Sequence, residues 1–322
     1  MLQFYKKRDF NTLISDTFSF FRLYGKNYIK NFILINGLIL ILLVGVVAFG
    51  FKEIFAQLFD SNMDGSYYYF EEYFATNTGT FIVTCALVGI IYLIFTAMLY
   101  TFPVFYMKRV ANGQTQVKTD DILSDMKNNI GKIIVLMLGL LFVFTPIAFI
   151  VMGISYTMIL LFFIGLLLLF FLVPVFSNWA GMLMFDYFHT SRGFFGAFSY
   201  GFSSLFSYNS GEKPGPFWKY WGSSAIMFLI YNTLVGIFTF VPIMFITASS
   251  IIAAESGENP TGIVFGGMGI VIFLLYCIGL IIQFLLVNLI MVNIGFIYYD
   301  SRTDLHKLKD LEDIQSIGVH EE

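Results

Sequence analysis

Six long apolar runs dominate the pattern of hydrophobic and polar positions along the chain. Each run is close to, or longer than, the roughly 18 residues that mark a membrane-spanning helix. A soluble amphipathic helix would show an apolar stripe opposite a polar one instead. We therefore predict an all-α integral membrane protein with six transmembrane helices, near residues 32–51, 81–107, 133–153, 155–185, 225–251 and 263–299. The third and fourth runs meet at a predicted tight turn, Gly153-Ile154-Ser155.

Amphipathic segments precede the first, third and fifth apolar runs. Their apolar residues recur at helical spacing, which is typical of helices that lie in the plane of the membrane interface. The three segments are Phe10–Lys30, Asp120–Lys132 and Phe194–Lys219. On the first, the predicted apolar face consists of Phe10, Leu13, Ile14, Phe18, Phe21 and Tyr24. Asp9 and Thr119 are the predicted N-caps of the first two helices.

The segments also repeat. The first contains Leu13-Ile14-Ser15-Asp16 and the second contains Ile122-Leu123-Ser124-Asp125. The even-numbered runs end alike, in Tyr106-Met107-Lys108-Arg109, Tyr187-Phe188-His189-Thr190-Ser191-Arg192 and Tyr298-Tyr299-Asp300-Ser301-Arg302. We predict three parallel hairpin repeats over residues 9–109, 119–192 and 193–302, followed by a short tail helix in 303–322.

Charge placement predicts the orientation. The chain is 58% hydrophobic and only 12% charged, and its charged residues lie outside the six runs. With both termini in the cytoplasm, every Lys and Arg except Lys52 falls on the inner side. This is the excess of cytoplasmic basic residues found in bacterial inner-membrane proteins. The first thirty residues are too charged for a signal peptide, so we expect the first run to remain as a span.

Groups typical of catalysis or ion coupling are missing from the pattern. Ion-coupled transporters usually place an acid or base within the bilayer, and here the deepest charges are Asp186 and Asp300, at the inner ends of two runs. The three histidines lie in separate segments, and Cys85 and Cys277 each stand alone in an apolar run. We therefore expect no cofactor, no metal site, no catalytic residue and no nucleic-acid binding.

Three groups of residues are candidate sites. Uncharged polar residues inside the spans form either interhelical hydrogen bonds or a polar pocket: Asn178, Trp179, Asn232, Gln283, Asn288 and Asn293. Basic residues near the N-terminus form either anionic-lipid contacts or ordinary topology signals: Lys6, Lys7, Arg8, Arg22, Lys26 and Lys30. Small residues at the start of the sixth run indicate close helix packing: Gly262, Gly266 and Gly269.

The leading amphipathic segments and the final Tyr298-Tyr299-Asp300-Ser301-Arg302 resemble a loose family of bacterial six-span membrane proteins. That family includes the membrane domain of some glycerophosphodiester phosphodiesterases, and it often ends its last span in Tyr-Tyr-Asp-Leu-Arg, where this chain has Ser301 in place of Leu. The resemblance implies a membrane architecture and an accessory role. It carries over no catalytic residue.

Together these features favour a non-enzymatic scaffold or accessory subunit of a complex in the bacterial cytoplasmic membrane. We expect its partners to be membrane lipids and other membrane proteins, the latter docking on Gly65–Phe74 and on the tail 303–322. One alternative is a carrier of lipids or small molecules that uses the polar residues of the last three spans. A membrane-embedded lipid enzyme is the third reading.

Overall fold

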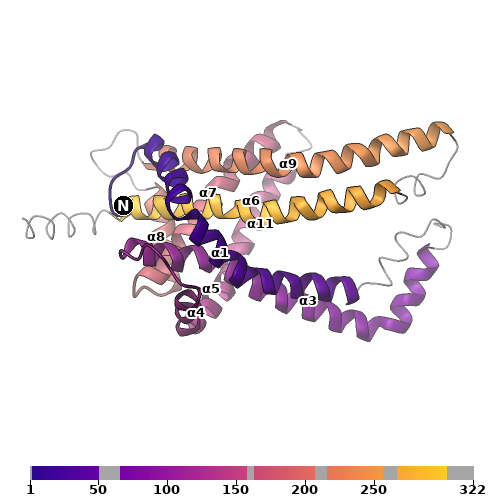
Figure 1. Cartoon of the computed structure of the whole chain (residues 1–322), viewed down its shortest axis with the longest axis horizontal. Coiled ribbons are helices and arrows are strands. Elements are labelled where there is room, and N and C mark those ends of the chain that lie inside the picture. Colours follow the sequence, from indigo (N-terminus) through magenta and orange to yellow (C-terminus); the bar gives the residue numbers. More distant parts are fainter. Residues whose placement is uncertain (1, 51–65, 158–162, 207–215, 257–266, 303–322) are drawn as a thin grey trace, which may run out of the picture. The chain divides into compact units, whose positions relative to one another are not determined.

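The computed structural model describes residues 2–50, 66–157, 163–206, 216–256 and 267–302, and every regular element in these ranges is a helix (Figure 1). The elements in chain order are α1 (Phe10–Gly50), α3 (Ser66–Ala111), α4 (Thr119–Asn128), α5 (Ile130–Gly139), the π-helical turn η2 (Leu140–Phe144), α6 (Thr145–Thr157), α7 (Phe163–His189), α8 (Phe194–Phe206), α9 (Pro216–Ser256) and α11 (Gly267–Ser301).

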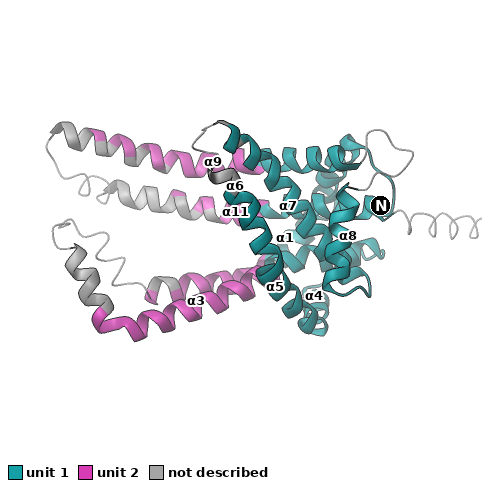
Figure 2. Ribbon diagram, turned by 180° about the vertical axis from the view of Figure 1, so that it is seen from behind, with its two compact units in different colours: residues 1–32, 99–230, 287–322 teal, residues 33–98, 231–286 magenta. Residues whose placement is uncertain are grey.

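The chain divides into two compact units, and the four longest helices each contribute to both (Figure 2). Unit 1 consists of Met1–Phe32, Leu99–Ile230 and Val287–Glu322. Unit 2 consists of Ile33–Met98 and Tyr231–Leu286. Most of the buried side chains among the described residues belong to unit 1.

Within the described residues, six helical segments are long and apolar enough to cross a membrane, in agreement with the predicted number. They are Phe10–Val46, Ala75–Ala111, Ile130–Gly153, Leu167–His189, Pro216–Val241 and Ile281–Ser301. The predicted turn at Gly153-Ile154-Ser155 is wrong, because these residues lie inside α6. Neither a proline nor a positive φ angle interrupts the helix there, so the isolated glycine is accommodated. The parallel repeat, the orientation and the interfacial location of the short helices stay predictions.

The predicted boundary between a first interfacial helix and the first span is also wrong. Helix α1 runs without a break from Phe10 to Gly50. Its buried face follows the predicted one only in part. The predicted Leu13 and Tyr24 are buried, but Phe18 is 46% exposed, and Phe20 and Tyr28, which were not predicted, are fully buried. The face rotates because the side chains of neighbouring helices, and not only the apolar positions of α1, decide which stripe is covered.

A π-helical turn precedes the proline of the third span. Pro146 is the second residue of α6, directly after η2. Proline cannot donate a backbone hydrogen bond and its ring displaces a carbonyl one turn earlier, and a widened turn accommodates both effects. The Thr145 hydroxyl donates to the Leu140 carbonyl oxygen at 2.7 Å. A local side chain thus satisfies a carbonyl in the widened turn.

Aromatic residues form the core of unit 1. The rings of Phe20, Tyr28 and Tyr106 pack mostly edge to face, with centroids 4.8–6.1 Å apart. All three are fully buried. Phe102 and Phe296 extend the same cluster. This core joins α1, α3 and α11 at the ends of the spans where the polar residues described below also gather.

Helix α8 lies against α7 at a close backbone approach. A Cβ atom added at Gly201 would lie 3.0 Å from the Trp179 carbonyl oxygen and 3.1 Å from the Leu183 backbone nitrogen. Trp179 also donates its indole N–H to the Phe198 carbonyl oxygen at 3.0 Å.

In unit 2, Phe95 stacks on Phe284 with ring centroids 5.4 Å apart. The described part of unit 2 otherwise exposes long apolar faces, as expected of helices that contact lipid.

Two helix starts test the predicted caps. The Asp9 carboxylate accepts the Thr12 backbone N–H at 2.8 Å, which confirms Asp9 as the N-cap of α1. The prediction for Thr119 is wrong by one position, because Thr119 is the first residue of α4 and Lys118 precedes the helix. The Thr119 hydroxyl donates to the Asn31 side chain instead. Asp121 caps the helix by accepting the Lys118 backbone N–H.

Candidate functional site

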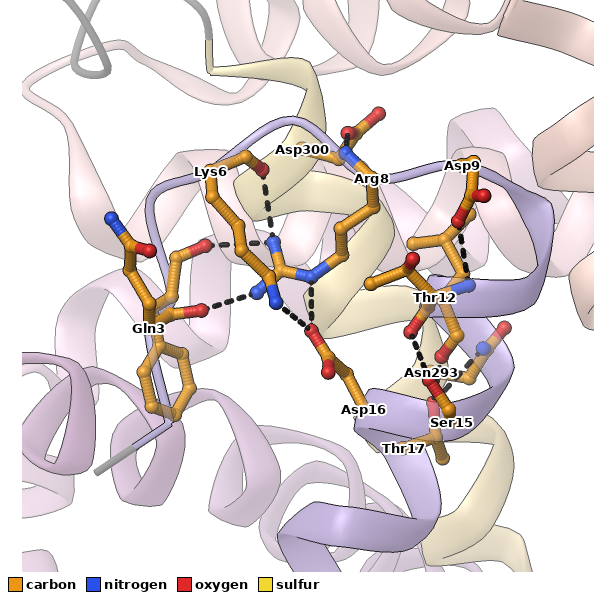
Figure 3. Close-up of polar contacts among 12 residues, drawn as sticks. Gln3, Lys6, Arg8, Asp9, Thr12, Ser15, Asp16, Thr17, Asn293 and Asp300 are labelled. Carbon is orange, nitrogen blue, oxygen red and sulfur yellow. Dashed lines mark hydrogen bonds and ion pairs between the residues drawn. The ribbon is translucent and has the colours of Figure 1, made fainter.

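The N-terminal segment of unit 1 is organised around the buried Arg8 (Figure 3). The Arg8 guanidinium donates to the Asp16 carboxylate at 2.9 Å and to the carbonyl oxygens of Gln3, Phe4 and Lys6 at 2.6–3.1 Å. Its side chain is fully buried. Burial away from water lowers the pKa of the Arg8 guanidinium, and the carboxylates of Asp16 and Asp300 oppose that shift. The arginine therefore folds residues 3–8 into a closed turn.

Asp300, at the end of α11, ties this segment to two helices. Its carboxylate accepts the Arg8 backbone N–H and the Tyr220 hydroxyl, the latter at 2.6 Å. The Lys219 ammonium lies 2.8 Å from the same carboxylate and donates to the Arg8 carbonyl oxygen at 3.0 Å. Asp300 is only 3% exposed, so its charge needs these donors. The N-terminal segment, the start of α9 and the end of α11 are thereby joined.

A second layer of buried polar groups crosses four helices. Asn293 of α11 donates to the hydroxyls of Thr17 and Ser223, at 3.1 and 2.8 Å. Ser224 of α9 donates to the side-chain oxygen of Asn178 at 2.5 Å and lies 3.3 Å from that of Asn293. All five residues are buried. Each of these groups is paired with protein, so this layer binds α1, α7, α9 and α11 to one another.

The other predicted pocket residues lie elsewhere. Trp179 bonds to α8, and Asn288 accepts the Tyr28 hydroxyl of α1 at 2.7 Å. Gln283 bonds to Tyr231 within unit 2, to which Asn232 also belongs. Of the six predicted residues, Asn178 and Asn293 are joined through Ser224.

The basic residues predicted as lipid contacts fall into two groups, those bonded to protein and those that are exposed. The prediction of lipid contact is wrong for Arg8, because its guanidinium is buried and bonded to protein groups. Lys6 is paired with Asp16 at 2.9 Å. Lys7, Arg22, Lys26 and Lys30 lie exposed, the last three on α1. Lipid contact by these four stays a prediction.

The ends of α3, α7 and α11 meet in a third polar group. Lys108 donates to the Phe188 carbonyl oxygen at 2.8 Å, and His189 bonds to the Tyr299 hydroxyl at 2.9 Å. The fully buried carboxylate of Asp186 accepts Arg192 at 3.0 Å, and Arg302 lies 3.8 Å away. Gly295 allows this approach, since a Cβ atom there would lie 2.5 Å from the Met107 sulfur. The similar ends of the three even-numbered apolar runs, noted in the sequence, therefore lie together.

Some predicted sites fall outside the described residues. Gly262, Gly266, His306, His320 and the tail 303–322 are among these. Gly269 lies in α11, and residues 66–74, predicted as a loop, form the start of α3. No group of three His, Cys, Asp or Glu side chains that would hold a metal occurs in the described part of the chain.

Sequence reasoning missed most members of the polar cluster. It singled out Asp186 and Asp300 as the deepest charges, but not the residues that bind them or the hydroxyls beside Asn293. Those missed are Asp16, Thr17, Arg192, Lys219, Tyr220, Ser223, Ser224 and Arg302. A usable signal was present for Asp186, because a deep aspartate requires a donor and Arg192 lies six positions after it. The partners of Asp300, Lys219 and Tyr220, lie far from it in the sequence and gave no such signal.

Comparisons of the chain with models of protein families, with curated proteins and with solved structures find no match. The class that the fold supports is an all-helical protein whose described residues include six candidate membrane-spanning helices.

Proposed function

We propose that this protein is a non-enzymatic scaffold or accessory subunit of a membrane-protein complex in the bacterial cytoplasmic membrane, with both termini in the cytoplasm. One observation carries the proposal. The buried polar side chains of unit 1 that would otherwise serve a substrate are paired with other helices, as in the layer formed by Asn178, Ser224 and Asn293. Polar groups used in this way hold helices in a fixed arrangement.

The packing around this layer supports the same function. A Cβ atom at Gly295 or Gly201 would meet neighbouring atoms, so the helices of unit 1 approach closely. A close-packed bundle presents a rigid surface to a partner, and rigidity reduces the conformational entropy lost on binding. Exposed aromatic side chains on α8, Phe195 (71% exposed) and Phe202 (47%), offer apolar area for a partner or for the membrane interface.

Purification from the native host tests the proposal. The full chain with a C-terminal tag is extracted in two mild detergents, and co-eluting proteins and lipids are quantified by mass spectrometry. We expect one or more membrane proteins at the same molar ratio in both detergents. A double substitution on α8, Phe195→Ser with Phe202→Ser, tests whether that helix carries the docking, with Ile41→Ser on α1 as the matched exposed control.

Two outcomes would contradict the scaffold. A chain that elutes alone in both detergents with one specific lipid would favour the carrier. Turnover of a lipid that is lost on alanine substitution of a single Ser, Asp or His, in a variant that still folds, would favour the enzyme. A partner ratio that changes with the detergent would also argue against a stable subunit.

A further inference from the structure

A polar hollow of about 330 Å³ opens in unit 1 where α3 ends and α4 meets α5. The polar side chains that line it are Lys108, Arg109, Asn112, Gln114, Asp125 and Asn129. It lies apart from the helix-joining layer around Asn293, and the residues of that layer do not line it.

Lys108 gives the hollow its available positive charge. The Arg109 guanidinium is held by the Asp125 carboxylate at 2.6 Å and by Gln114 at 3.1 Å. Lys108, in contrast, donates to one carbonyl oxygen among the described residues, that of Phe188, and an ammonium group has three N–H donors. The Asp125 carboxylate attracts the Lys108 charge and Lys132 repels it. Because Asp125 is already bonded to Arg109, a further anion here would add to the attraction.

Two candidate membrane spans meet at the hollow. The candidate span Ala75–Ala111 ends among its lining residues, and the span Ile130–Gly153 begins directly after Asn129. Headgroups occupy the outer part of a bilayer about 40–45 Å thick, around a hydrocarbon core of about 30 Å. In a membrane-spanning chain, a site at the ends of two spans would lie on the headgroup side of the hydrocarbon core.

An exposed apolar stripe runs along α5 and η2, beginning one residue after Asn129 of the hollow. Ile130, Ile134, Leu138 and Phe142 follow one another at intervals of four residues and are 61%, 54%, 49% and 70% exposed. Residues four apart lie on one face of a helix. The stripe begins next to Asn129 and continues along the candidate span, as the acyl chain of a lipid bound in the hollow would.

We propose that the hollow binds the phosphate of an anionic phospholipid, with Lys108 as its main charged contact and the acyl chain lying on the stripe from Ile130 to Phe142. Asn112, exposed at the rim, supplies an uncharged donor. A soluble phosphate compound would use the same charge but not the stripe. This site does not use the layer of Asn178, Ser224 and Asn293 on which the scaffold proposal rests, although Lys108 also bonds to the end of α7.

Native mass spectrometry of the purified full chain tests the site. The chain is titrated with phosphatidylglycerol, with phosphatidylcholine of the same acyl chains, and with glycerol 3-phosphate. We expect one phosphatidylglycerol to bind at least fivefold more tightly than phosphatidylcholine, and glycerol 3-phosphate to bind far more weakly. Lys108→Ala should weaken phosphatidylglycerol binding about fivefold, the usual effect of one basic residue at an anionic surface.

Two further variants keep the test decisive. Asn112→Asp changes an exposed rim residue and should weaken binding by a similar factor even if Lys108→Ala folds poorly, because it adds a negative charge. Lys127→Ala, an exposed basic residue of α4 that does not line the hollow, should leave binding unchanged. Equal losses in all three variants, or equal affinity for both lipids, would overturn the site. Tight binding of glycerol 3-phosphate would overturn the assignment to a lipid.

Discussion

Arg8 shows how a residue's role changes between sequence and structure. In the sequence it belongs to a run of basic residues, yet its side chain is buried against Asp16. We expect Asp16→Ala to lower the free energy of unfolding by about 3 kcal/mol, because it leaves a buried guanidinium without its carboxylate. Unfolding in mixed detergent micelles measures this.

The matched control is Asp120→Ala, which changes an exposed aspartate of α4 and should alter the free energy of unfolding by less than about 0.5 kcal/mol. Replacing both partners, Arg8→Met with Asp16→Leu, should recover part of the loss, since no charge is left buried. A double variant as unstable as Asp16→Ala would show that the pair is not the source of the effect.

Asn293 is the hydrogen-bonding centre of the layer that joins four helices. We expect Asn293→Leu to cost about 1–2 kcal/mol in the free energy of unfolding, because Thr17 and Ser223 each lose a partner. Ser203→Ala, which removes bonds only within its own exposed helix turn, should cost less than about 0.5 kcal/mol. If Asn293→Leu instead leaves stability unchanged but abolishes binding of a small molecule, the carrier reading is favoured.

The stability of the first turn of α1 depends on pH through the Asp9 carboxyl. Hydrogen bonding to Thr12, first through its side chain and then through its backbone N–H, lowers the pKa of the Asp9 carboxyl. The pKa of the Asp9 carboxyl in the folded state thus lies below its unfolded value of about 3.9. The contribution of Asp9 to the free energy of unfolding is therefore fully present above that unfolded pKa and is lost as pH falls through the folded pKa.

We therefore expect thermal unfolding in detergent to shift to lower temperature below about pH 4. Asp9→Asn should reduce this pH dependence while leaving stability at pH 7 nearly unchanged, because asparagine also caps helices well. Asp121 contributes in the same direction, since its bonds to Gln114 and Lys118 lower its pKa as well. An Asp9→Asn variant with the full acid dependence would assign the effect to other groups.

At the scale of helices, the contact of α7 with α8 depends on one glycine. Gly201→Val should separate the two helices, because even a Cβ atom would lie about 3 Å from the backbone of α7. We expect a loss of roughly 2 kcal/mol or more in the free energy of unfolding and increased labelling of a cysteine introduced at Ala197, which is buried in this contact. Gly131→Ala, where a Cβ atom would meet open space, should be neutral or stabilising by up to about 1 kcal/mol.

At the scale of the whole molecule, the two units differ in how much of each helix is covered. The buried face of α1 in unit 1 runs through Leu13, Phe20 and Tyr28, whereas Leu38, Ile41 and Val44 of the same helix are more than half exposed. Hydrogen exchange in detergent should therefore be slower for the part of α1 before Phe32 than for the part after it. Equal exchange along the helix would show that lipid-like surroundings protect both parts alike.

The amino-acid sequence by itself determined the all-helical class of the described residues and the number and approximate positions of their candidate spans. These follow from the length of each apolar run, which is a local property, because about 20 residues are needed to cross the hydrocarbon core. The cap at Asp9 was also predictable, since a cap involves only residues within one turn.

The tertiary structure decided what depends on neighbours distant in the sequence. It made α1 continuous from Phe10 to Gly50, buried Arg8, and assigned Asn232 and Gln283 to unit 2 but Asn178 and Asn293 to unit 1. Which side of a helix is buried, and whether a polar group finds a partner, depends on the helices that pack against it. For the same reason the hollow beside Lys108, formed by residues from 105 to 129, became visible only in the folded chain.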